Sequence, residues 1–497
     1  MKMWRQSSGD SRRHPRAPDA WGDPGPVGLR RHSPARRANL EAMQPPDIST
    51  QTSTNLVARL RESDTKYARV IFLDYNGLAR ARNVSLNALP QAFERGVNFS
   101  SPTVDFNSRD AFPPEAAFDL ASSDFWARPD PATCRPAAGA DQTVDFLADL
   151  VQSDGKSWEG CPRTALRRVI EQATAQDLAF IVAFEPEGYV FRRTDREVSF
   201  VGPPQFATLD GLDMEPHFIG ELLARLKSAG VQVLQWSEEY GPGQLEINLR
   251  HLPALEATDA FVTFRHTFRA VARKHGLHGT FMPKPFGQHA GSGLHVHLSA
   301  APPNDHSRNL FDDLNDPVLG LSATGRHALG GLLAHGEALT AVGATTVNSY
   351  KRFLPGSWAP THITYAVGSR AAFVRVPERE TPRRLELRVG DAAGNPYLYL
   401  TAILAAMLDG IDRRLDPGAA TPGDVGALSA KVAASQGLCP VPPTLEHALD
   451  HLAADAVLRD ALGPLIVEEF IKIKRSEWDA FRQHVSDWDR TWYLDRY

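Results

Sequence analysis

Four separate segments of the chain alternate polar with apolar residues. They are Glu185-Pro186-Glu187, Gln244-Leu245-Glu246-Ile247-Asn248, His295-Val296-His297-Leu298-Ser299 and Arg384-Leu385-Glu386-Leu387-Arg388. Because successive side chains of a β-strand point to opposite faces, each segment predicts a strand with one apolar and one polar face. If these strands share a sheet, helices can pack on its apolar face. The opposite face then gathers carboxylates, imidazoles and guanidinium groups.

Similar patterns predict the other elements of an α+β fold. A strand over residues 68–73, a turn at 74–77 and a second strand to Val84 open a small domain that ends near residues 155–162. A further strand covers residues 180–191. Apolar residues at helical spacing predict helices over 164–175, 214–229, 258–274, 330–342, 397–415 and 445–492, with Thr258 as the N-cap of the third. Residues 417–443 are rich in proline and glycine and predict a loop with room for one short helix.

Residues 1–50 differ from the rest of the chain. They are rich in arginine, proline, glycine and serine and show no apolar period, which predicts a disordered extension. An arginine-rich targeting or binding arm is the functional alternative, and a true start at Met43 is another interpretation. If the extension is a dispensable tail, a chain that begins at Met43 is expected to assemble and turn over like the full chain.

Composition and charge exclude several classes of partner. The 497 residues are 42% hydrophobic and 23% charged, with a net charge of −5, so nothing indicates a nucleic acid or an anionic membrane as the main partner. The three cysteines form no CxxC motif, which predicts a reducing, cytoplasmic location without a disulfide framework. No apolar run reaches the length of a transmembrane helix.

The polar residues of the four segments indicate a metal site. Two carboxylates within an apolar strand, Glu185 and Glu187, are costly unless they are paired or bound to metal. Glu239 and Glu246 flank a Gly-Pro-Gly turn, and His295 and His297 follow a Gly-Ser-Gly sequence that allows backbone to approach a ligand closely. Together with Glu386 they supply enough ligands for two adjacent divalent ions.

Each group also has a purely structural interpretation. Glu185 and Glu187 would be an exposed pair on an edge strand, and Glu238 and Glu239 would lie in a solvated acidic loop. A histidine of the third segment would be a satisfied core residue, and the arginines around Glu386 would form a salt-bridge ladder. Considered together, oxygen ligands with one imidazole suit Mg²⁺ or Mn²⁺ better than Zn²⁺, and the arginines imply a phosphate or carboxylate substrate. The sequence has no Walker A motif, so any ATP is held by metal ions and arginines rather than by a P-loop.

Longer motifs resemble the glutamine synthetase family over roughly residues 55–497. They are FEPEGYVF from Phe184, GPGQLEINL from Gly241, TFMPKPF and GSGLHVHLS from Thr280, NSYKRFLPGSWAP from Asn348, SRAAFVRVP from Ser369 and RRLELRVGDAAGNPYLYL from Arg383. The resemblance implies an N-terminal β-grasp domain over 55–157 and a catalytic domain over 160–497 with a curved antiparallel sheet. It also implies a homo-dodecamer or another ring, in which active sites lie between neighbouring subunits.

The resemblance further implies a role for each matching position. The metal ligands would be Glu187, Glu239 and Glu246 for the first ion and Glu185, His295 and Glu386 for the second, among two or three Mg²⁺ or Mn²⁺ ions. Contacts to ATP would come from His297, Ser299, Arg375 and Arg384, and Arg370 would stabilise the transferred phosphoryl group. The acid substrate would be held by Gly291, Arg352 and Arg388.

Some positions depart from the family pattern. The flap that closes the site usually carries a glutamate two residues after Pro-Gly, where this chain has Trp358. The loop aspartate that binds ammonium corresponds to Ser100, and the asparagines usual before Gly-Ser-Gly and before Arg370 are Ala290 and Ser369. An indole cannot accept a proton as a carboxylate does, although its face attracts cations. Both anionic groups of the ammonium site are therefore replaced.

These departures predict an ATP-dependent ligase that joins glutamate to an organic amine through a γ-glutamyl phosphate. The branch it resembles makes γ-glutamylpolyamines or γ-glutamyl-monoamides, which would place it in polyamine catabolism or related nitrogen metabolism. A true glutamine synthetase that uses ammonium is one alternative, and a non-catalytic scaffold with the same fold is another. Ala290 also leaves open an acid substrate other than glutamate.

Overall fold

A computed structural model describes residues 53–497, apart from Leu120, Arg196, Pro204, Leu314, Pro317, 379–381, Asp424 and Ser429. The extension expected over residues 1–50, and the start expected at Met43, lie outside the described residues. The described residues belong to one compact unit. The predicted division between residues 55–157 and 160–497 therefore stays a prediction.

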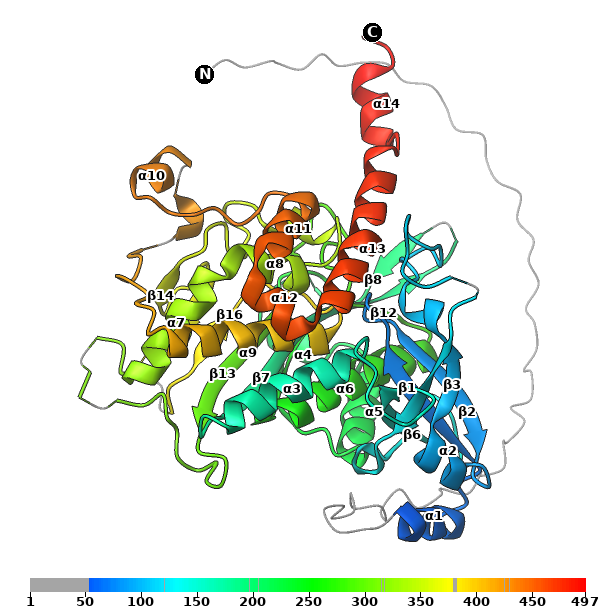
Figure 1. Ribbon diagram of the computed structural model, residues 1–497. Helices are drawn as coiled ribbons and strands as arrows, with labels where there is room; N and C mark the ends of the chain where they lie inside the picture. Colours follow the sequence, from blue (N-terminus) through cyan, green and yellow to red (C-terminus); the bar gives the residue numbers. More distant parts are fainter. Residues whose placement is uncertain are drawn as a thin grey trace, which may run out of the picture. The chain divides into compact units, whose positions relative to one another are not determined.

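The first sheet is built from the N-terminal part of the chain (Figure 1). Its strands follow the order β2-β1-β6-β4-β3, and β5 pairs with β6. Strands β1 and β6 are parallel, whereas their other neighbours are antiparallel. The bounds are β1 Tyr67–Leu73, β2 Ala79–Ser85, β3 Val97–Ser100, β4 Asp124–Pro129, β5 Arg135–Pro136 and β6 Thr143–Val151. Helices α1 (Ser53–Glu62) and α2 (Leu89–Arg95) accompany it.

The second sheet unites the four alternating segments. Its order is β14-β15-β16-β13-β7-β10-β9, and β8, β11 and β12 also pair with β7. The bounds are β7 Ala179–Arg193, β8 Val198–Phe200, β9 Val233–Glu238, β10 Gln244–Leu249, β11 Leu252–Pro253, β12 His278–Thr280, β13 Leu294–Ala301, β14 Tyr365–Val367, β15 Val374–Val376 and β16 Leu385–Leu387. The prediction that these segments share one sheet is confirmed.

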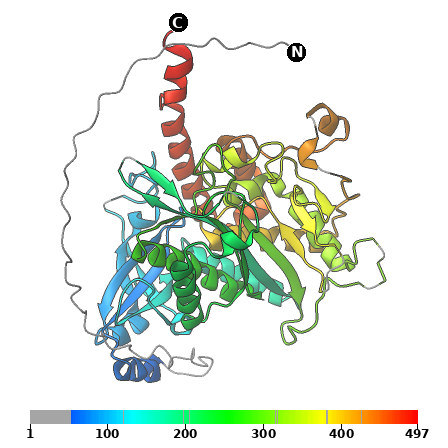
Figure 2. The ribbon, with the colours of Figure 1, turned by 180° about the vertical axis from the view of Figure 1, so that it is seen from behind.

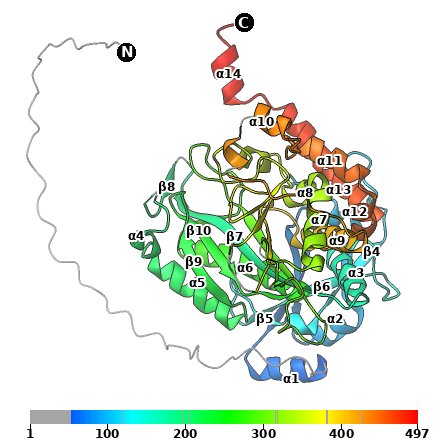
Figure 3. The same cartoon turned by 90° about the vertical axis from the view of Figure 1, so that its left-hand side faces the viewer.

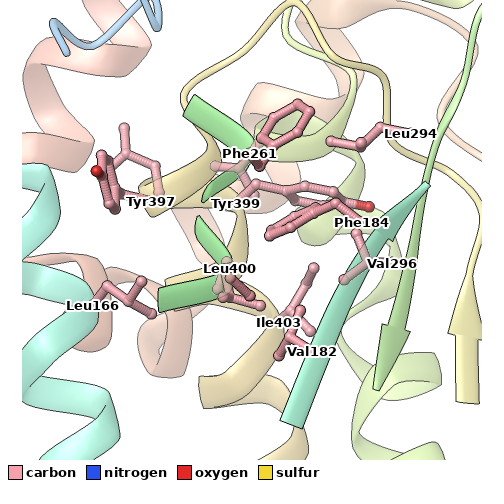
Figure 4. Close-up of a cluster of buried hydrophobic side chains, with 14 of the residues drawn as sticks. Leu166, Val182, Phe184, Phe261, Leu294, Val296, Tyr397, Tyr399, Leu400 and Ile403 are labelled. Atoms are coloured by element: carbon pink, nitrogen blue, oxygen red, sulfur yellow. The ribbon is translucent and has the colours of Figure 1, made fainter. Parts of the chain in front are cut away.

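Helices cover the apolar face of this sheet, and Figure 3 shows α5 and α6 beside β7, β9 and β10. In Figure 4 the side chains of Val182, Phe184 and Val296 meet residues of α6 and α9. The rings of Phe184 and Phe261 stack with centroids 4.9 Å apart. The helix bounds are α3 Pro162–Thr174, α4 Leu209–Leu212, α5 Pro216–Ser228, α6 Ala254–Lys274, α7 Ala323–Ala334, α8 Gly336–Gly343, α9 Pro396–Asp412, α10 Ala430–Ser435, α11 Leu445–Ala454, α12 Ala456–Leu462, α13 Pro464–Arg482 and α14 Asp487–Tyr493.

Several element predictions need correction. Thr258 is not an N-cap, because α6 already begins at Ala254 and the Thr258 hydroxyl donates to the Ala254 carbonyl within the helix (2.8 Å). The helix predicted over 330–342 is broken at His335, between α7 and α8. The helix predicted over 445–492 is four helices. Asp455 caps α12, Gly463 adopts a φ of 98° before Pro464, and a capping box at Ser486 starts α14.

The described residues contain no helix that combines the length and apolar character needed to cross a bilayer. Their three cysteines, Cys134, Cys161 and Cys439, are all free thiols.

The helix break at His335 contains a buried charge cluster. Its Nδ1 lies 2.6 Å from Asp455 and its Nε2 lies 3.0 Å from Asp409. Burial alone would lower the pKa of His335, but its hydrogen bonds to Asp455 and Asp409 outweigh this and raise the pKa above its usual value. The imidazolium thus links α8 and α12 to α9.

We expect His335→Gln to destabilise the protein more at low pH than at high pH. A pKa raised on folding contributes stability that is fully present below the unfolded pKa of about 6.5 and is lost as pH rises through the folded value. Loss of two charge-assisted hydrogen bonds should cost roughly 2 kcal/mol or more near pH 6. Thermal unfolding of both proteins at pH 6 and pH 9 tests this, with the exposed His217→Gln as control. An equal effect at both pH values would contradict it.

Candidate active site

The strand register brings the predicted polar residues face to face. Glu187 of β7 pairs with Glu246 of β10, Glu185 pairs with His295 of β13, and His297 pairs with Glu386 of β16. This arrangement follows from the alternation of the sequence, because all these side chains leave the sheet on the face opposite the helices.

A cavity of about 540 Å³ opens above this face. Nearly all predicted site residues line it, from six regions of the chain. They are Glu185, Glu187, Glu239, Glu246, Gly291, His295, His297, Arg352, Trp358, Arg370, Arg375, Arg384, Glu386 and Arg388. Ser299 is not among the lining residues, since it lies further along β13, and its predicted contact to ATP stays a prediction.

Two histidines hold Glu185 by hydrogen bonds from His295 Nδ1 (2.8 Å) and His297 Nε2 (2.9 Å). Arg384 Nε donates to His297 Nδ1 (3.0 Å), so the proton of a neutral His297 is on Nε2. His295 Nε2 is turned towards Glu187 Oε1, at 3.6 Å. In many metal sites a carboxylate accepts a hydrogen bond from one ring nitrogen of a histidine. This fixes the tautomer of the ring and leaves its other nitrogen to bind the metal ion.

The pKa values of the carboxylates in the cavity depend on whether their charged neighbours are other carboxylates or cations. Burial, followed by the charges of Glu185 and Glu187, raises the pKa of Glu246 far above its usual range. Burial and Glu187 raise the pKa of Glu239 in the same way. Burial also opposes ionisation of Glu386, but the charge of Arg388 lowers its pKa to about 2. The Glu246 end of the cavity therefore needs more positive charge, whereas Arg375 and Arg388 supply it directly at Glu386.

Divalent ions fit this need. Ligand atoms of Glu185, His295 and Glu386 lie within 4.8 Å of one another, and so do those of Glu187, Glu246 and His295. Glu239 lines the same cavity outside both groups. Oxygen-rich donor sets with one imidazole suit Mg²⁺ or Mn²⁺. The assignment of individual residues to particular ions stays a prediction.

Two glycines keep a narrow part of the cavity open beside Arg352. A Cβ atom at Gly293 would lie 3.1 Å from His295 Nε2 and 3.2 Å from Arg352 Nη2, and one at Gly291 would lie 2.7 Å from Arg352 Cγ. Arg352 Nη1 is anchored by the Gly390 carbonyl (2.9 Å). The second guanidinium nitrogen can then meet a carboxylate that enters over the two glycines.

Further arginines lie around Glu386 on the same face of the sheet. Arg375 Nη1 contacts Glu386 at 2.7 Å, and Arg388 forms a hydrogen bond with the other oxygen of Glu386. Arg370 and Arg384 line the cavity as well. Such a cluster can neutralise the several negative charges of a phosphoryl group in transfer.

Trp358 lies on the rim of the cavity in a strained backbone conformation, with a φ of 61°. Its ring meets Tyr240 edge to face, with centroids 5.5 Å apart, and Tyr240 stacks on Phe206 at 4.7 Å. We call Phe206, Tyr240 and Trp358 the aromatic wall. Ser100, at the end of β3, does not line this cavity within the described chain.

Sequence reasoning missed several residues of the site. Asn248 donates a hydrogen bond to Glu185, and Gln244 donates to Glu187 (3.2 Å) and to the Gly291 carbonyl (3.0 Å). Both share the polar face of β10 with Glu246, so the alternation could have identified them. Phe206, Tyr240, Lys284 and His289 lie in connecting segments, where no periodic signal exists. Glu238, next to Glu239, points away from the cavity and contacts Thr208.

The chain is similar to known proteins over most of its length. Residues 159–493 match the glutamine synthetase catalytic domain. The chain is 33% identical over 439 residues to the glutamine synthetase of Halobacterium salinarum, with 87% of this chain and 94% of the relative covered. It is also 33% identical over 457 residues to the glutamate–methylamine ligase of Methyloversatilis universalis, with 88% and 98% covered. A solved GmaS–ADP complex matches with a TM-score of 0.79 at 32% identity, covering 88% of this chain and 99% of that one.

The fold and site define an ATP-dependent carbon–nitrogen ligase. The chain belongs to the glutamine synthetase family, in which its relatives include both glutamine synthetases and a glutamate–methylamine ligase.

Proposed function

We propose that the protein joins the γ-carboxylate of glutamate to an organic amine, with ATP as the second substrate and two or three Mg²⁺ or Mn²⁺ ions as cofactors. A γ-carboxylate oxygen attacks the γ-phosphorus of ATP, and ADP leaves. The amine nitrogen then attacks the acyl carbon of the γ-glutamyl phosphate, inorganic phosphate leaves, and the nitrogen loses a proton. The product is a γ-glutamylamide.

The residues of the cavity suit the first step. Arg352, beside Gly291 and Gly293, would orient the acid substrate together with Arg388. Arg370, Arg375, Arg384 and His297, which line the same cavity, would bind phosphate oxygens and offset the charge of the transferred group. The metal ions, when bound at the carboxylates, would polarise the phosphoryl oxygens.

The observation that carries the amine assignment is Trp358. The carboxylate and arginine residues of the family site are all present around the cavity, whereas an indole lines it at the flap position. The chain therefore keeps what activates glutamate and lacks what would attract and deprotonate ammonium. The glutamate–methylamine ligase relative shows that the family includes an organic-amine branch.

A screen for phosphate release tests the proposal. The full-length protein is given glutamate, ATP and Mg²⁺ with ammonium, methylamine, ethanolamine, putrescine, spermidine or a small aromatic amine, and mass spectrometry identifies the product. We expect at least one γ-glutamylamide to form faster than glutamine. If glutamine forms fastest, the second candidate is correct, a glutamine synthetase, as several of the relatives are named. A non-catalytic scaffold would release no phosphate with any amine.

The resemblance to the family also underlies our proposals for the domain organisation, the location and the assembly of the protein. Residues 55–157 would form a β-grasp domain, which the mixed sheet β2-β1-β6-β4-β3 supports. Three free cysteines support a cytoplasmic location. A ring homo-oligomer would let a neighbouring subunit bring its Ser100 loop to this cavity.

We expect the C-terminal helices to support that assembly. Helices α13 and α14 extend beyond the other helices in Figures 1 and 2. Their ends expose large apolar residues, among them Phe481, Val485, Trp488, Trp492 and Leu494. Such a patch marks an interaction surface. Light scattering on a chain that ends at Gln483 should give a particle mass lower by roughly half or more, whereas the solvent-facing Arg490→Ala should leave the mass unchanged. An unaltered mass after truncation would exclude this role.

A further inference from the structure

Within one subunit, the described residues leave the cavity no carboxylate to spare for a second positive charge on the amine. Among the described residues, the carboxylates that line it are Glu185, Glu187, Glu239, Glu246 and Glu386. Each of them is a predicted metal ligand. Apart from the Tyr240 phenol, the other ionisable lining residues that the structure describes are basic, and they are Lys284, His289, His295, His297, Arg352, Arg370, Arg375, Arg384 and Arg388. A distal ammonium group would therefore lose water without gaining an ion pair.

The aromatic wall offers a different kind of contact. Phe206, Tyr240 and Trp358 are 37%, 46% and 50% exposed, although large aromatic side chains are usually more deeply buried. Their rings form one continuous surface, stacked between Phe206 and Tyr240 and edge-on between Tyr240 and Trp358. A ligand with an apolar or aromatic body would cover this surface and gain from its burial.

Backbone contacts hold the wall in place. Ser357 Oγ lies 2.6 Å from both the Arg352 and the Leu354 carbonyl oxygens and can donate its single proton to either, which holds the loop that carries Trp358. Ala207 N donates to the Glu238 carbonyl (3.1 Å), which ties Phe206 to the end of β9. Rings held in this way select a ligand by shape at little entropic cost.

The wall also borders the reacting end of the cavity. Tyr240 directly follows Glu239, and both line the same cavity as Glu187 and Arg370. An amine whose nitrogen approaches the acyl phosphate there would direct its substituent along the rings of Tyr240 and Trp358.

We infer that the acceptor is a monoamine with an apolar or aromatic substituent rather than a polyamine, and that Phe206 and Tyr240, with Trp358, determine this specificity. This inference rests on the proposed glutamate–amine ligation. It narrows the substrate class, because a polyamine would place its second ammonium group beside aromatic rings and basic residues. The alternative acceptor is a polyamine whose distal ammonium group would bind the aromatic rings through cation–π contacts.

Amines of equal length separate these alternatives. Full-length protein with glutamate, ATP and Mg²⁺ is assayed with butylamine against 1,4-diaminobutane and with pentylamine against 1,5-diaminopentane, and then with 2-phenylethylamine. We expect kcat/KM for each monoamine to exceed that of its diamine by about tenfold or more, and 2-phenylethylamine to be used at least as well as butylamine. Diamines that match or surpass the monoamines would overturn the inference and favour the polyamine.

Variants of the wall test the residues themselves. Phe206→Leu and Tyr240→Leu should each lower the ratio of kcat/KM for 2-phenylethylamine to kcat/KM for methylamine by about fivefold or more. Leu209→Ala, an exposed apolar residue in the neighbouring helix α4, should leave this ratio unchanged. Formation of γ-glutamyl hydroxamate with hydroxylamine reports whether a variant is folded and still activates glutamate. An active variant with an unchanged ratio would exclude its residue from specificity.

The outcomes also separate this inference from the proposed function. If ammonium is the best substrate, the proposed ligation of organic amines is wrong. If organic amines are used but diamines are preferred, the ligation stands and only the monoamine inference fails.

Discussion

Replacing Glu246 by glutamine is expected to abolish ligase activity without unfolding the protein. Glu246 faces Glu187 across β7 and β10, and its ligand atom lies within 4.8 Å of those of Glu187 and His295. Burial and the neighbouring carboxylates raise its pKa, so without metal ions the neutral form is favoured. Glutamine has the shape of that neutral form, and stability should be nearly unchanged. Metal binding needs the carboxylate, and kcat at saturating Mg²⁺ should fall by about 100-fold or more.

Phosphate release is measured at saturating Mg²⁺, and thermal unfolding is measured separately in EDTA, for the wild type and each variant. Glu171→Gln, which changes an exposed carboxylate on α3, is the matched control and should retain wild-type activity and stability. Glu187→Ala should lose activity in the same way as Glu246→Gln. Near-normal turnover of either site variant at high Mg²⁺ would remove its residue from the metal site.

The polar face of the site was predictable because its signal is local. An alternation of two residues fixes which side chains share a face, whatever the rest of the chain does. It predicted that Glu185, Glu187, Glu246 and His295 lie on the polar face of their strands before any strand order was known. What it could not give was the order of the strands, which depends on pairings between residues as distant as Glu185 and His295.

Contacts between residues that do not recur at a regular spacing in the sequence were harder to predict. His335 lies at the break between α7 and α8, where Asp409 and Asp455 hold its ring, and neither aspartate is near it in sequence. Phe206 and Tyr240 are separated by helix α5 and strand β9, and only the folded chain stacks their rings. Family resemblance identified Trp358 but not these two partners. Tertiary contacts of this kind are therefore where the structure adds most to the sequence.

The identity of residue 358 should decide between ammonium and organic amines. In the wild type, an amine substituent can cover the exposed part of Trp358 and gain about 0.8 kcal/mol for each buried CH₂ group. Two or three such groups correspond to roughly ten- to fiftyfold in kcat/KM. We therefore expect the best organic amine to exceed ammonium by about tenfold or more.

Trp358→Glu should move this preference back towards ammonium. A carboxylate at this position can pair with an ammonium ion and accept its proton, while it removes the apolar surface that an organic amine would cover. Trp358→Phe is the matched control, because it keeps an aromatic ring at the same backbone position, where φ is 61°. The ratio of kcat/KM for the best organic amine to kcat/KM for ammonium should fall by about tenfold or more in Trp358→Glu and stay near the wild-type value in Trp358→Phe. Equal ratios in all three proteins would show that the indole does not set the choice of nucleophile, and the site would then have to exclude ammonium by another group.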